Sequence, residues 1–321
     1  MRKYSVVIPV YNRPDEVDEL LESLTQQTYD NFEVLIIEDG STKKCDQIVK
    51  RYAGRLDINY FYKVNTGQGF SRNFGFERAK GDYFIVFDSD CLIPSHYFQT
   101  VEEYLNNYPL DAFGGPDKAH KSFTNVQKAI SYSMTSPFTT GGIRGGKKRI
   151  GTFHPRSFNM GISKEVFEKT KGYLITRMGE DIEFSIRIME CGFKSGLIED
   201  AYVYHKRRTN FKQFYKQLHF FGRARINISR FYRKELKLVH TFPAIFTLGL
   251  LFYTISYFIH PQLLLIGSGL LVLFIAMVFF HSTYQNKSLV VGFLSIGTAF
   301  TQLIAYGAGF ITELARKLTK G

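Results

Sequence analysis

Two pairs of neighbouring carboxylates, far apart in the chain, are the residues with the clearest chemical potential. Asp88 and Asp90 flank one serine directly after an apolar run, and Glu180 stands next to Asp181. Two carboxylates this close repel each other unless a cation lies between them. Mg²⁺ and Mn²⁺ take oxygen ligands and bridge carboxylates to phosphates. The first pair therefore predicts a metal–diphosphate site, although a turn with Asp at both ends has the same pattern.

The second pair suits a different task. A group transfer needs a base that takes the proton of the acceptor, and this base must be separate from the metal ligands. The residues at 182–189 have a helical pattern, so Glu180 and Asp181 also fit the first turn of a helix. A helix N-terminus stabilises an ionised carboxylate, so the two interpretations are compatible.

The surrounding elements are expected to place these carboxylates along one edge of a sheet. Apolar runs predict strands at 4–10, 32–37, 58–62 and 83–87, and amphipathic stretches predict helices at 14–28, 43–53 and 69–80. This alternation is typical of a parallel α/β sheet, in which ligands bind at the carboxyl ends of the strands. Polar residues follow the strands there, namely Tyr11-Asn12-Arg13, Glu38-Asp39 and Asp88-Ser89-Asp90.

Other nucleotide-binding classes are disfavoured by the loops. The first strand is followed by Tyr11-Asn12-Arg13-Pro14 instead of a glycine-rich turn, and no P-loop is present. NAD enzymes and ATPases are therefore not expected. The three cysteines, Cys45, Cys91 and Cys191, form no CxxC pair, which favours free structural thiols in a reducing compartment.

Charge and hydropathy are distributed unevenly. The net charge is +12, yet residues 1–201 hold 26 basic and 27 acidic side chains, whereas residues 202–237 hold 11 basic and one acidic. Residues 241–259 and 262–280 contain no charged side chain, and each is close to the roughly 20 residues that span a bilayer. Residues 288–311 form a third apolar stretch that is richer in Gly, Ser and Thr. A buried helical hairpin in a soluble domain is the alternative.

The basic segment predicts the orientation in the membrane. Basic residues remain on the cytoplasmic side, so the first 240 residues should be cytoplasmic, and no signal peptide precedes the first strand. A third span would place Arg316, Lys317 and Lys320 outside, whereas a re-entrant or interfacial segment would keep them inside; the sequence leaves both open. We expect a multi-pass inner-membrane protein with a catalytic domain (1–201), a basic amphipathic segment that contacts anionic lipids (202–240), a transmembrane region (241–311) and a basic tail (312–321).

A set of short motifs then resembles glycosyltransferase family 2. It comprises P-V-Y-N at Pro9–Asn12, E-D-G-S at Glu38–Ser41, G-x-x-R-N-x-G at Gly69–Gly75, D-S-D at Asp88–Asp90, F-N-M-G-I-S-K-E-V-F at Phe158–Phe167 and E-D after Gly179. The motifs run in order over about residues 4–230. K-G-Y stands where the family usually has G-G-F.

The resemblance implies an α/β GT-A fold with a mixed, mainly parallel sheet, and an inverting sugar transfer from a nucleotide-diphosphate sugar with Mg²⁺ or Mn²⁺. Carried over residue by residue, it gives these roles: Pro9 and Tyr11 at the base, Asn12 beside them, Asp39 at the base or ribose, Arg72 near the nucleotide or diphosphate, Asp88 at the ribose or metal, Asp90 on the metal, and Asp181 as catalytic base with Glu180 beside it.

Further residues have two interpretations each. His205 completes the metal site or is a partly buried surface histidine. Arg208 clamps phosphate or belongs to the basic segment. Asn159, His154 and Arg156 are candidates for the acceptor or diphosphate side. Residues 139–156, rich in glycine and basic residues, form a lid or a solvated loop.

The resulting hypothesis is transfer of a single sugar to a lipid-linked or glycolipid acceptor, in cell-surface polysaccharide or glycolipid synthesis. Processive polysaccharide synthases of the family carry Q-x-x-R-W, whereas this chain has Gln217–Arg223 and no Trp. A processive synthase and a catalytically inactive nucleotide-sugar-binding membrane protein are the alternatives. No nucleic-acid-binding motif is present, so no nucleic acid is expected as a partner.

Overall fold

The chain consists of two compact units. The computed structural model describes residues 1–141, 153–256 and 260–320. The N-terminal unit comprises Met1–His120 and Thr152–Lys206, and the C-terminal unit comprises Lys121–Gly151 and Arg207–Gly321.

The N-terminal unit is built on a seven-stranded sheet of order β3-β2-β1-β4-β8-β6-β9. The strands are β1 (Tyr4–Val10), β2 (Phe32–Asp39), β3 (Ile58–Lys63), β4 (Tyr83–Phe87), β6 (Ala112–Gly114), β8 (Asn159–Ser163) and β9 (Ser195–Leu197). β1 to β4 are parallel neighbours, and β8 runs antiparallel between β4 and β6. This sheet is the mixed, mainly parallel sheet that the sequence predicts.

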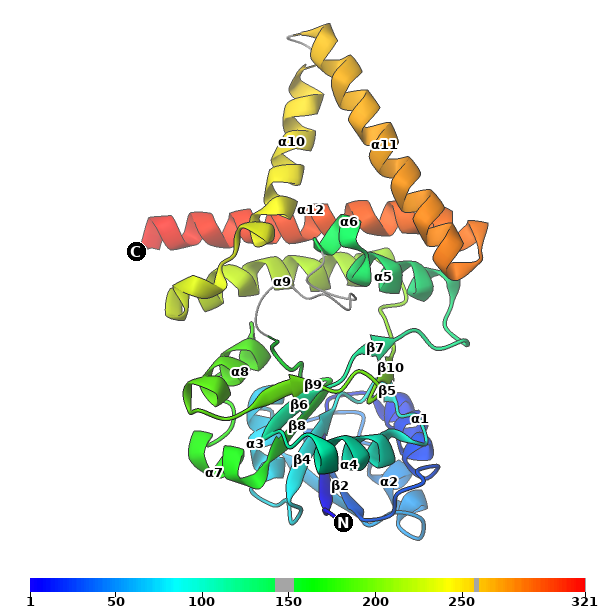
Figure 1. Cartoon of the computed structure of the whole chain (residues 1–321), viewed down its shortest axis with the longest axis vertical. Helices are drawn as coiled ribbons and strands as arrows, with labels where there is room; N and C mark the ends of the chain where they lie inside the picture. The colour runs from blue at the N-terminus through cyan, green and yellow to red at the C-terminus, as the bar shows by residue number, and fades with distance from the viewer. Residues whose placement is uncertain (142–152, 257–259, 321) are drawn as a thin grey trace. The chain divides into compact units, whose positions relative to one another are not determined.

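Helices cover both faces of the sheet (Figure 1). The pleat sends Val6 and Ile8 to one core cluster and Val7 to the other, so the strands read as continuous apolar runs. The first face is covered by α1 (Pro14–Leu24), α2 (Asp46–Tyr52) and α4 (Tyr97–Asn107), and the second by α3 (Gln68–Phe76), α7 (Lys164–Thr170) and α8 (Glu180–Glu190).

Three helices are shorter than the sequence predicts. The predicted helices at 14–28 and 69–80 end at Leu24 and Phe76, and the one predicted at 43–53 begins at Asp46. The late start of α2 has a local cause, because the backbone N–H of Cys45 donates to the Glu38 carboxylate at 2.8 Å and fixes the preceding loop.

A second, small sheet stands next to the end of β4. It has the order β5-β10-β7 and consists of β5 (Cys91–Leu92), β10 (Val203–His205) and β7 (Asp117–Lys118). β10 runs antiparallel to β5, with His205 opposite Cys91. This register brings residue 205 to the chain just after Asp90, although more than a hundred residues separate the two in sequence.

The C-terminal unit is helical. It contains α5 (Asn125–Thr135), α6 (Pro137–Thr140), α9 (Phe211–Phe231), the 3-10 turns η1 (Arg233–Glu235) and η2 (Leu238–Thr241), α10 (Phe242–Ser256), α11 (Pro261–Asn286) and α12 (Leu289–Lys320). α5 and α6 precede β8 in the chain but pack against α12. α9 lies within the predicted basic amphipathic segment (202–240); its Phe214 and Leu218 are buried, whereas its Phe211 and Tyr215 are exposed.

Three helices of this unit are long and apolar enough to cross a membrane. They are Leu238–Ser256, Gln262–Asn286 and Leu289–Thr319. The first two overlap the predicted spans at 241–259 and 262–280, although residues 257–259 lie outside the described part of the chain, and the third continues well beyond the apolar stretch at 288–311. These helices indicate association with a membrane.

Candidate active site

The Asp88-Ser89-Asp90 loop sends its two carboxylates to different partners. Asp88 Oδ1 accepts from Arg72 Nη2 at 2.9 Å. Asp90 Oδ2 accepts from Arg13 Nη1 at 3.0 Å, and its Oδ1 lies 3.0 Å from His205 Nε2. The structure therefore brings Asp90 and His205 together, as the metal-site interpretation of His205 requires, whereas Asp88 pairs with an arginine.

His205 is held in place by its strand and by an aromatic ring. β10 sets it opposite Cys91, and its imidazole stacks on Phe158 with the centroids 4.9 Å apart. The ring is only 14% exposed, which limits its freedom to swing away from Asp90. The strand and the stacked ring hold His205 beside Asp90, where a metal ligand would have to lie.

The donor set at Asp90 and His205 fits a divalent cation. In an octahedral shell with bonds of about 2.1 Å, neighbouring ligand atoms stand about 3.0 Å apart. The measured separation of Asp90 Oδ1 and His205 Nε2 is 3.0 Å. One carboxylate and one imidazole leave most of the shell open, as a metal shared with a diphosphate requires.

Cys91 lies beside these two candidate ligands but is poorly suited to be a third metal ligand. Its sulfur is within 4.8 Å of their ligand atoms. Burial and the nearby Asp90 raise the pKa of the Cys91 thiol well above its ordinary value. The protonated thiol donates to the Phe158 carbonyl at 3.6 Å. Mg²⁺ and Mn²⁺ favour oxygen ligands over sulfur, so we interpret Cys91 as a packing residue, as the sequence indicates.

Arg72 joins the two carboxylate pairs. Besides the bond to Asp88, its Nη1 lies 3.7 Å from Glu180 Oε1, and its guanidinium lies 5.3 Å from the centre of the Tyr173 ring. The side chain is only 1% exposed. Arg72 is therefore a buried bridge that fixes the Asp88 loop against the start of α8, and its predicted contact with the nucleotide is not needed to explain its charge.

Glu180 and Asp181 occupy the first turn of α8. Gly179, with φ of 101°, is the residue before the helix, in a conformation that favours glycine. Asp181 Oδ2 lies 3.2 Å from Arg156 Nη1, and Asp181 is the more exposed of the two acids. Glu180 is buried and accepts from Gln68 Nε2. Burial, reinforced by the charge of Asp181, raises the pKa of Glu180.

Asp39 is buried at the end of β2. Its carboxylate accepts from Lys63 Nζ and from the backbone N–H groups of Thr66 and Gly67, the last two at 2.9 Å. Burial alone would raise its pKa, but Lys63 and the N–H of Thr66 outweigh burial and hold the pKa of Asp39 below its ordinary value. Asp39 thus remains ionised and orders the loop before α3.

The end of β1 contributes a backbone turn and an exposed ring. Asn12 has a positive φ of 55°, and its side-chain oxygen accepts from the backbone N–H groups of Thr42 and Lys43. This ties the loop after β1 to the loop after β2. Tyr11 is 54% exposed beside it. Pro9 lies within β1, opposite Ile37 of β2.

The acceptor-side predictions have mixed outcomes. Asn159 is fully buried, donates to the Ala201 carbonyl and accepts from Tyr97 Oη, so both ends of its amide are used inside the fold. We therefore correct its assignment to a structural one. Arg156 meets Asp181, as described above, and His154 is half-buried. Arg208 belongs to the C-terminal unit. Of the predicted lid, residues 142–152 lie outside the described residues.

Sequence reasoning gave no role to three residues that hold the site together. Arg13 pairs with Asp90, Lys63 with Asp39, and Gln68 with Glu180. The signal for Arg13 and Lys63 is their place at strand ends, where the predicted ligands also lie. Gln68 follows Gly67 at the start of α3, and nothing in its sequence context indicates Glu180 as a partner.

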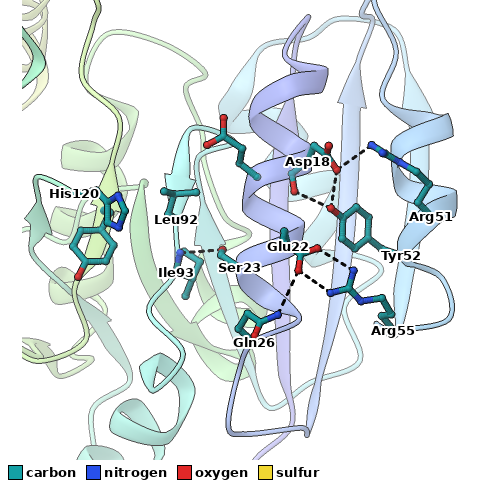
Figure 2. A pocket seen from close by; sticks show the side chains of 12 residues that line it. Asp18, Glu22, Ser23, Gln26, Arg51, Tyr52, Arg55, Leu92, Ile93 and His120 are labelled. Atoms are coloured by element: carbon teal, nitrogen blue, oxygen red, sulfur yellow. Dashed lines mark hydrogen bonds and ion pairs between the residues drawn. The ribbon is translucent and has the colours of Figure 1, made fainter. Parts of the chain in front are cut away.

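The N-terminal unit also has a separate pocket, in which charged side chains of the lining pair with one another. It is lined by α1 and α2 residues together with Leu92, Ile93, His120 and Tyr204. Figure 2 shows Asp18 bonded to Arg51 and Tyr52, and Glu22 bonded to Arg55. No residue predicted for the site lines it. The carboxylate loops, which carry the chemistry, are therefore the better candidate.

Comparison with known proteins identifies the family. The model of glycosyl transferase family 2 matches residues 5–171. The chain belongs to this family. An uncharacterized glycosyltransferase from Haemophilus influenzae is 30% identical over 218 residues, which are 64% of this chain and 70% of the relative. One from Rickettsia bellii is 42% identical over 132 residues, but they span only 40% of this chain and 18% of that relative.

A solved structure confirms the fold over nearly the whole chain. The mannosyltransferase PcManGT from Pyrobaculum calidifontis, in complex with GDP-Man and Mn²⁺, superposes with a TM-score of 0.68. The match covers 98% of this chain and 88% of the other at 15% identity. The chain thus has the GT-A fold that the motifs imply, followed by apolar helices.

Proposed function

We propose that the protein transfers a single sugar, with inversion, from a nucleotide-diphosphate sugar to a lipid-linked or glycolipid acceptor at the cytoplasmic face of the membrane. The observation that carries this proposal is the Arg72 bridge, which holds Asp88 at 2.9 Å and Glu180 at 3.7 Å. It brings the metal-site loop and the proposed base into one site, as group transfer requires.

The donor site is proposed at the ends of β1, β2 and β4. Tyr11 offers an exposed ring on which a base can stack, next to Pro9 and Asn12. Asp39 is ionised and only 4% exposed, so its carboxylate can accept a hydrogen bond from the base or the ribose. Asp88 and Arg72 would border the ribose and the diphosphate.

The leaving group requires positive charge. Asp90 and His205 would hold Mg²⁺ or Mn²⁺, which neutralises the charge that develops on the departing diphosphate. Arg13, already 3.0 Å from Asp90, orients this carboxylate and adds a second cation beside it. The solved mannosyltransferase with Mn²⁺ supports the use of a divalent cation on this fold.

The acceptor side is proposed at Asp181. The acceptor hydroxyl oxygen attacks the anomeric carbon, the bond from that carbon to the diphosphate oxygen breaks, and the proton passes to Asp181. Arg156, 3.2 Å away, fixes the orientation of the carboxylate before the acceptor enters. Attack from the face opposite the leaving group inverts the anomeric centre.

The acceptor class and the side of the membrane follow from the C-terminal unit. Three helices are apolar enough to cross a bilayer, and the 202–237 segment before them holds 11 basic residues. An acceptor with a lipid tail is the substrate that such an enzyme meets at its own surface. The basic residues favour anionic lipids on the cytoplasmic leaflet. A role in cell-surface polysaccharide or glycolipid synthesis follows.

The test uses the purified full-length chain with Mn²⁺. A panel of nucleotide sugars is first screened by thermal shift, since a ligand that binds the native state raises the melting temperature. The donor that stabilises most is then incubated, radiolabelled, with lipid extract. We expect one labelled sugar per lipid. A ladder of products indicates the processive alternative, and stabilisation by a donor without any transfer indicates the inactive binding protein.

A further inference from the structure

The last helix, α12, runs beside α9 over most of its length. Gly222 of α9 lies against the Tyr306 backbone, and Gly309 of α12 lies against the His219 backbone, so the two helices approach closely. Further along, Ser229 accepts from Lys317 Nζ at 3.2 Å. From Phe211 beside Gly297 to Ser229 beside Lys317 the residue numbers rise together along both helices, which are therefore parallel.

An ion-pair cluster fixes this pair near its end. Glu313 is 8% exposed. Its carboxylate lies 3.1 Å from Arg223 Nε and 3.2 Å from Arg230 Nη2, both on α9, and 3.7 Å from Arg316 Nη1 of its own helix. Glu313 is the only acidic residue after Glu235. The cluster holds α12 against α9, so the two helices must lie at the same depth in the membrane.

α9 cannot enter the hydrocarbon core. Its 21 residues contain no acid and five basic residues, which are Lys212, Lys216, Arg223, Arg225 and Arg230. A charged residue at the bilayer centre costs about 2.5–3.5 kcal/mol even on the mildest scale. α9 is instead a basic amphipathic helix of the kind that lies at the headgroup level.

Among the described residues, the recorded contacts of the α10–α11 hairpin with α12 come from the first half of α10 and the second half of α11. Within the part of the chain that the structure describes, the contacts of α12 with the hairpin include Gly307 against Pro243, the Phe246–Phe300 ring pair and the Ser282–Ser295 hydrogen bond. Pro243 and Phe246 begin α10, and Ser282 lies near the end of α11. A third span would pack along the hairpin instead of crossing its base.

The far half of the hairpin is exposed and apolar. Its exposed residues include Leu251, Phe252, Ile255, Leu265, Ile266 and Leu270. Tyr253 Oη and Ser268 Oγ hydrogen-bond to each other at 2.8 Å and join the two helices. Figure 1 shows α9 and α12 side by side, with α10 and α11 leading away from them.

We propose that α12 lies in the plane of the membrane, at the headgroup level together with α9, and that only α10 and α11 cross the bilayer. The α9–α12 pair then forms a surface whose partner is the anionic headgroup layer of one leaflet. Because four residues separate Lys206 of the N-terminal unit from the start of α9, the proposal places both ends of the chain on the same side of the membrane. This inference rests on the proposed membrane anchoring but not on the proposed reaction.

Cysteine labelling in sealed membrane vesicles of known orientation tests this topology. The full-length chain offers a natural reference, because Cys191 is exposed while Cys45 and Cys91 are buried. Thr319→Cys near the end of α12 and His260→Cys between α10 and α11 are each made in a Cys191→Ser background. Neither belongs to the proposed site. A membrane-impermeant maleimide is then applied to inside-out and right-side-out vesicles.

We expect Thr319→Cys to react in the same vesicles as Cys191, and His260→Cys to react in the opposite ones. Reaction of Thr319→Cys together with His260→Cys would show that α12 crosses the bilayer and would overturn the proposal. Reaction of His260→Cys together with Cys191 would show that the hairpin does not cross, which overturns the two-span arrangement. Neither result depends on whether the chain transfers sugar.

Discussion

At the scale of single residues, the sequence predicts candidate site members but not how they pair. Asp88, Asp90 and His205 are all expected at a metal, yet Asp88 turns to Arg72 while Asp90 meets His205 at 3.0 Å. This division depends on the register of β10 on β5. Those strands have three and two residues, too few to give a periodic pattern. Asn159 illustrates the opposite error, because a motif residue is here a buried structural amide.

The proposed metal ligands, Asp90 and His205, give the first prediction. His205→Gln removes the imidazole ligand while keeping a similar side-chain volume. We expect the Mn²⁺ concentration for half-maximal stabilisation by donor nucleotide to rise about 10- to 100-fold, the range seen when metal-site partners are lost. Isothermal titration with Mn²⁺ measures the change directly.

Cys91→Ala is the matched control for the metal pair. It removes the third group near the site, and because Mn²⁺ favours oxygen ligands over sulfur, the Mn²⁺ affinity should not change. An equal loss of affinity in both variants would place the metal on the cysteine and would contradict the assignment.

The buried charge of Asp39 gives a prediction on pH. Its folded pKa lies below the ordinary 3.8, so its stabilisation is full above that value and is lost as the pH falls through the folded pKa. Asp39→Asn should lower the free energy of unfolding by about 2 kcal/mol at pH 7, the size of a hydrogen bond to a charged group. The gap to the wild type should close below about pH 3.8.

Denaturant titrations at several pH values measure this gap. Asp57→Asn is the control, because Asp57 is 61% exposed and pairs with Lys3 at 3.8 Å on the surface. Its removal should change stability by less than about 0.5 kcal/mol at every pH. A gap for Asp39→Asn that does not depend on pH would refute the assigned ionisation.

At the scale of elements, the long apolar runs of β1, β2 and β4 are predicted within two residues, because burial on both faces leaves an unmistakable pattern. The extent of α12, in contrast, is not predicted. The predicted segment stops at residue 311, just before Glu313, because a lone acid ends an apolar window. In the structure Arg223 and Arg230 neutralise this acid, and the helix continues to Lys320.

Close packing of α9 on α12 gives a prediction at this scale. A Cβ at Gly222 would meet the backbone of Tyr306, which cannot move aside as a flexible side chain can. Gly222→Ala should therefore destabilise the protein by about 1–3 kcal/mol, the usual cost of overpacking. The thermal midpoint of the detergent-solubilised chain should fall.

Gly249→Ala is the counterpart on α10. Among the described residues, a Cβ at Gly249 would meet nothing within 4 Å, so this variant should keep or slightly raise the midpoint through better helix propensity. Equal midpoints for the two alanine variants would show that α9 and α12 are not in close contact.

At the scale of the whole molecule, the average hydropathy of −0.12 hides an apolar hairpin and a basic helix. The sequence locates both from their local composition. It does not decide whether the third apolar segment crosses the membrane. The position of a helix in the membrane depends on which helices pack against it, and composition does not reveal these contacts. The contacts between α9 and α12 are the observation on which we base the proposed depth of this segment.

The apolar hairpin of α10 and α11 gives a prediction about how the protein is anchored in the membrane. High salt screens the attraction of basic residues to headgroups but does not weaken the burial of α10 and α11. The chain should therefore stay in the membrane fraction in 1 M NaCl and in alkaline carbonate, and only detergent should release it. Release by salt would mean that the basic surface alone binds the membrane.

The central claim is that Asp181 takes the acceptor proton at a site where the donor is held independently. The most direct test measures sugar transfer and donor binding for the Asp181→Asn variant, with Glu190→Gln at the exposed far end of the same helix as control. We predict that Asp181→Asn binds the donor with Mn²⁺ as the wild type does but transfers about 10²- to 10⁴-fold more slowly, while Glu190→Gln is unaffected. Undiminished transfer by Asp181→Asn would contradict the account.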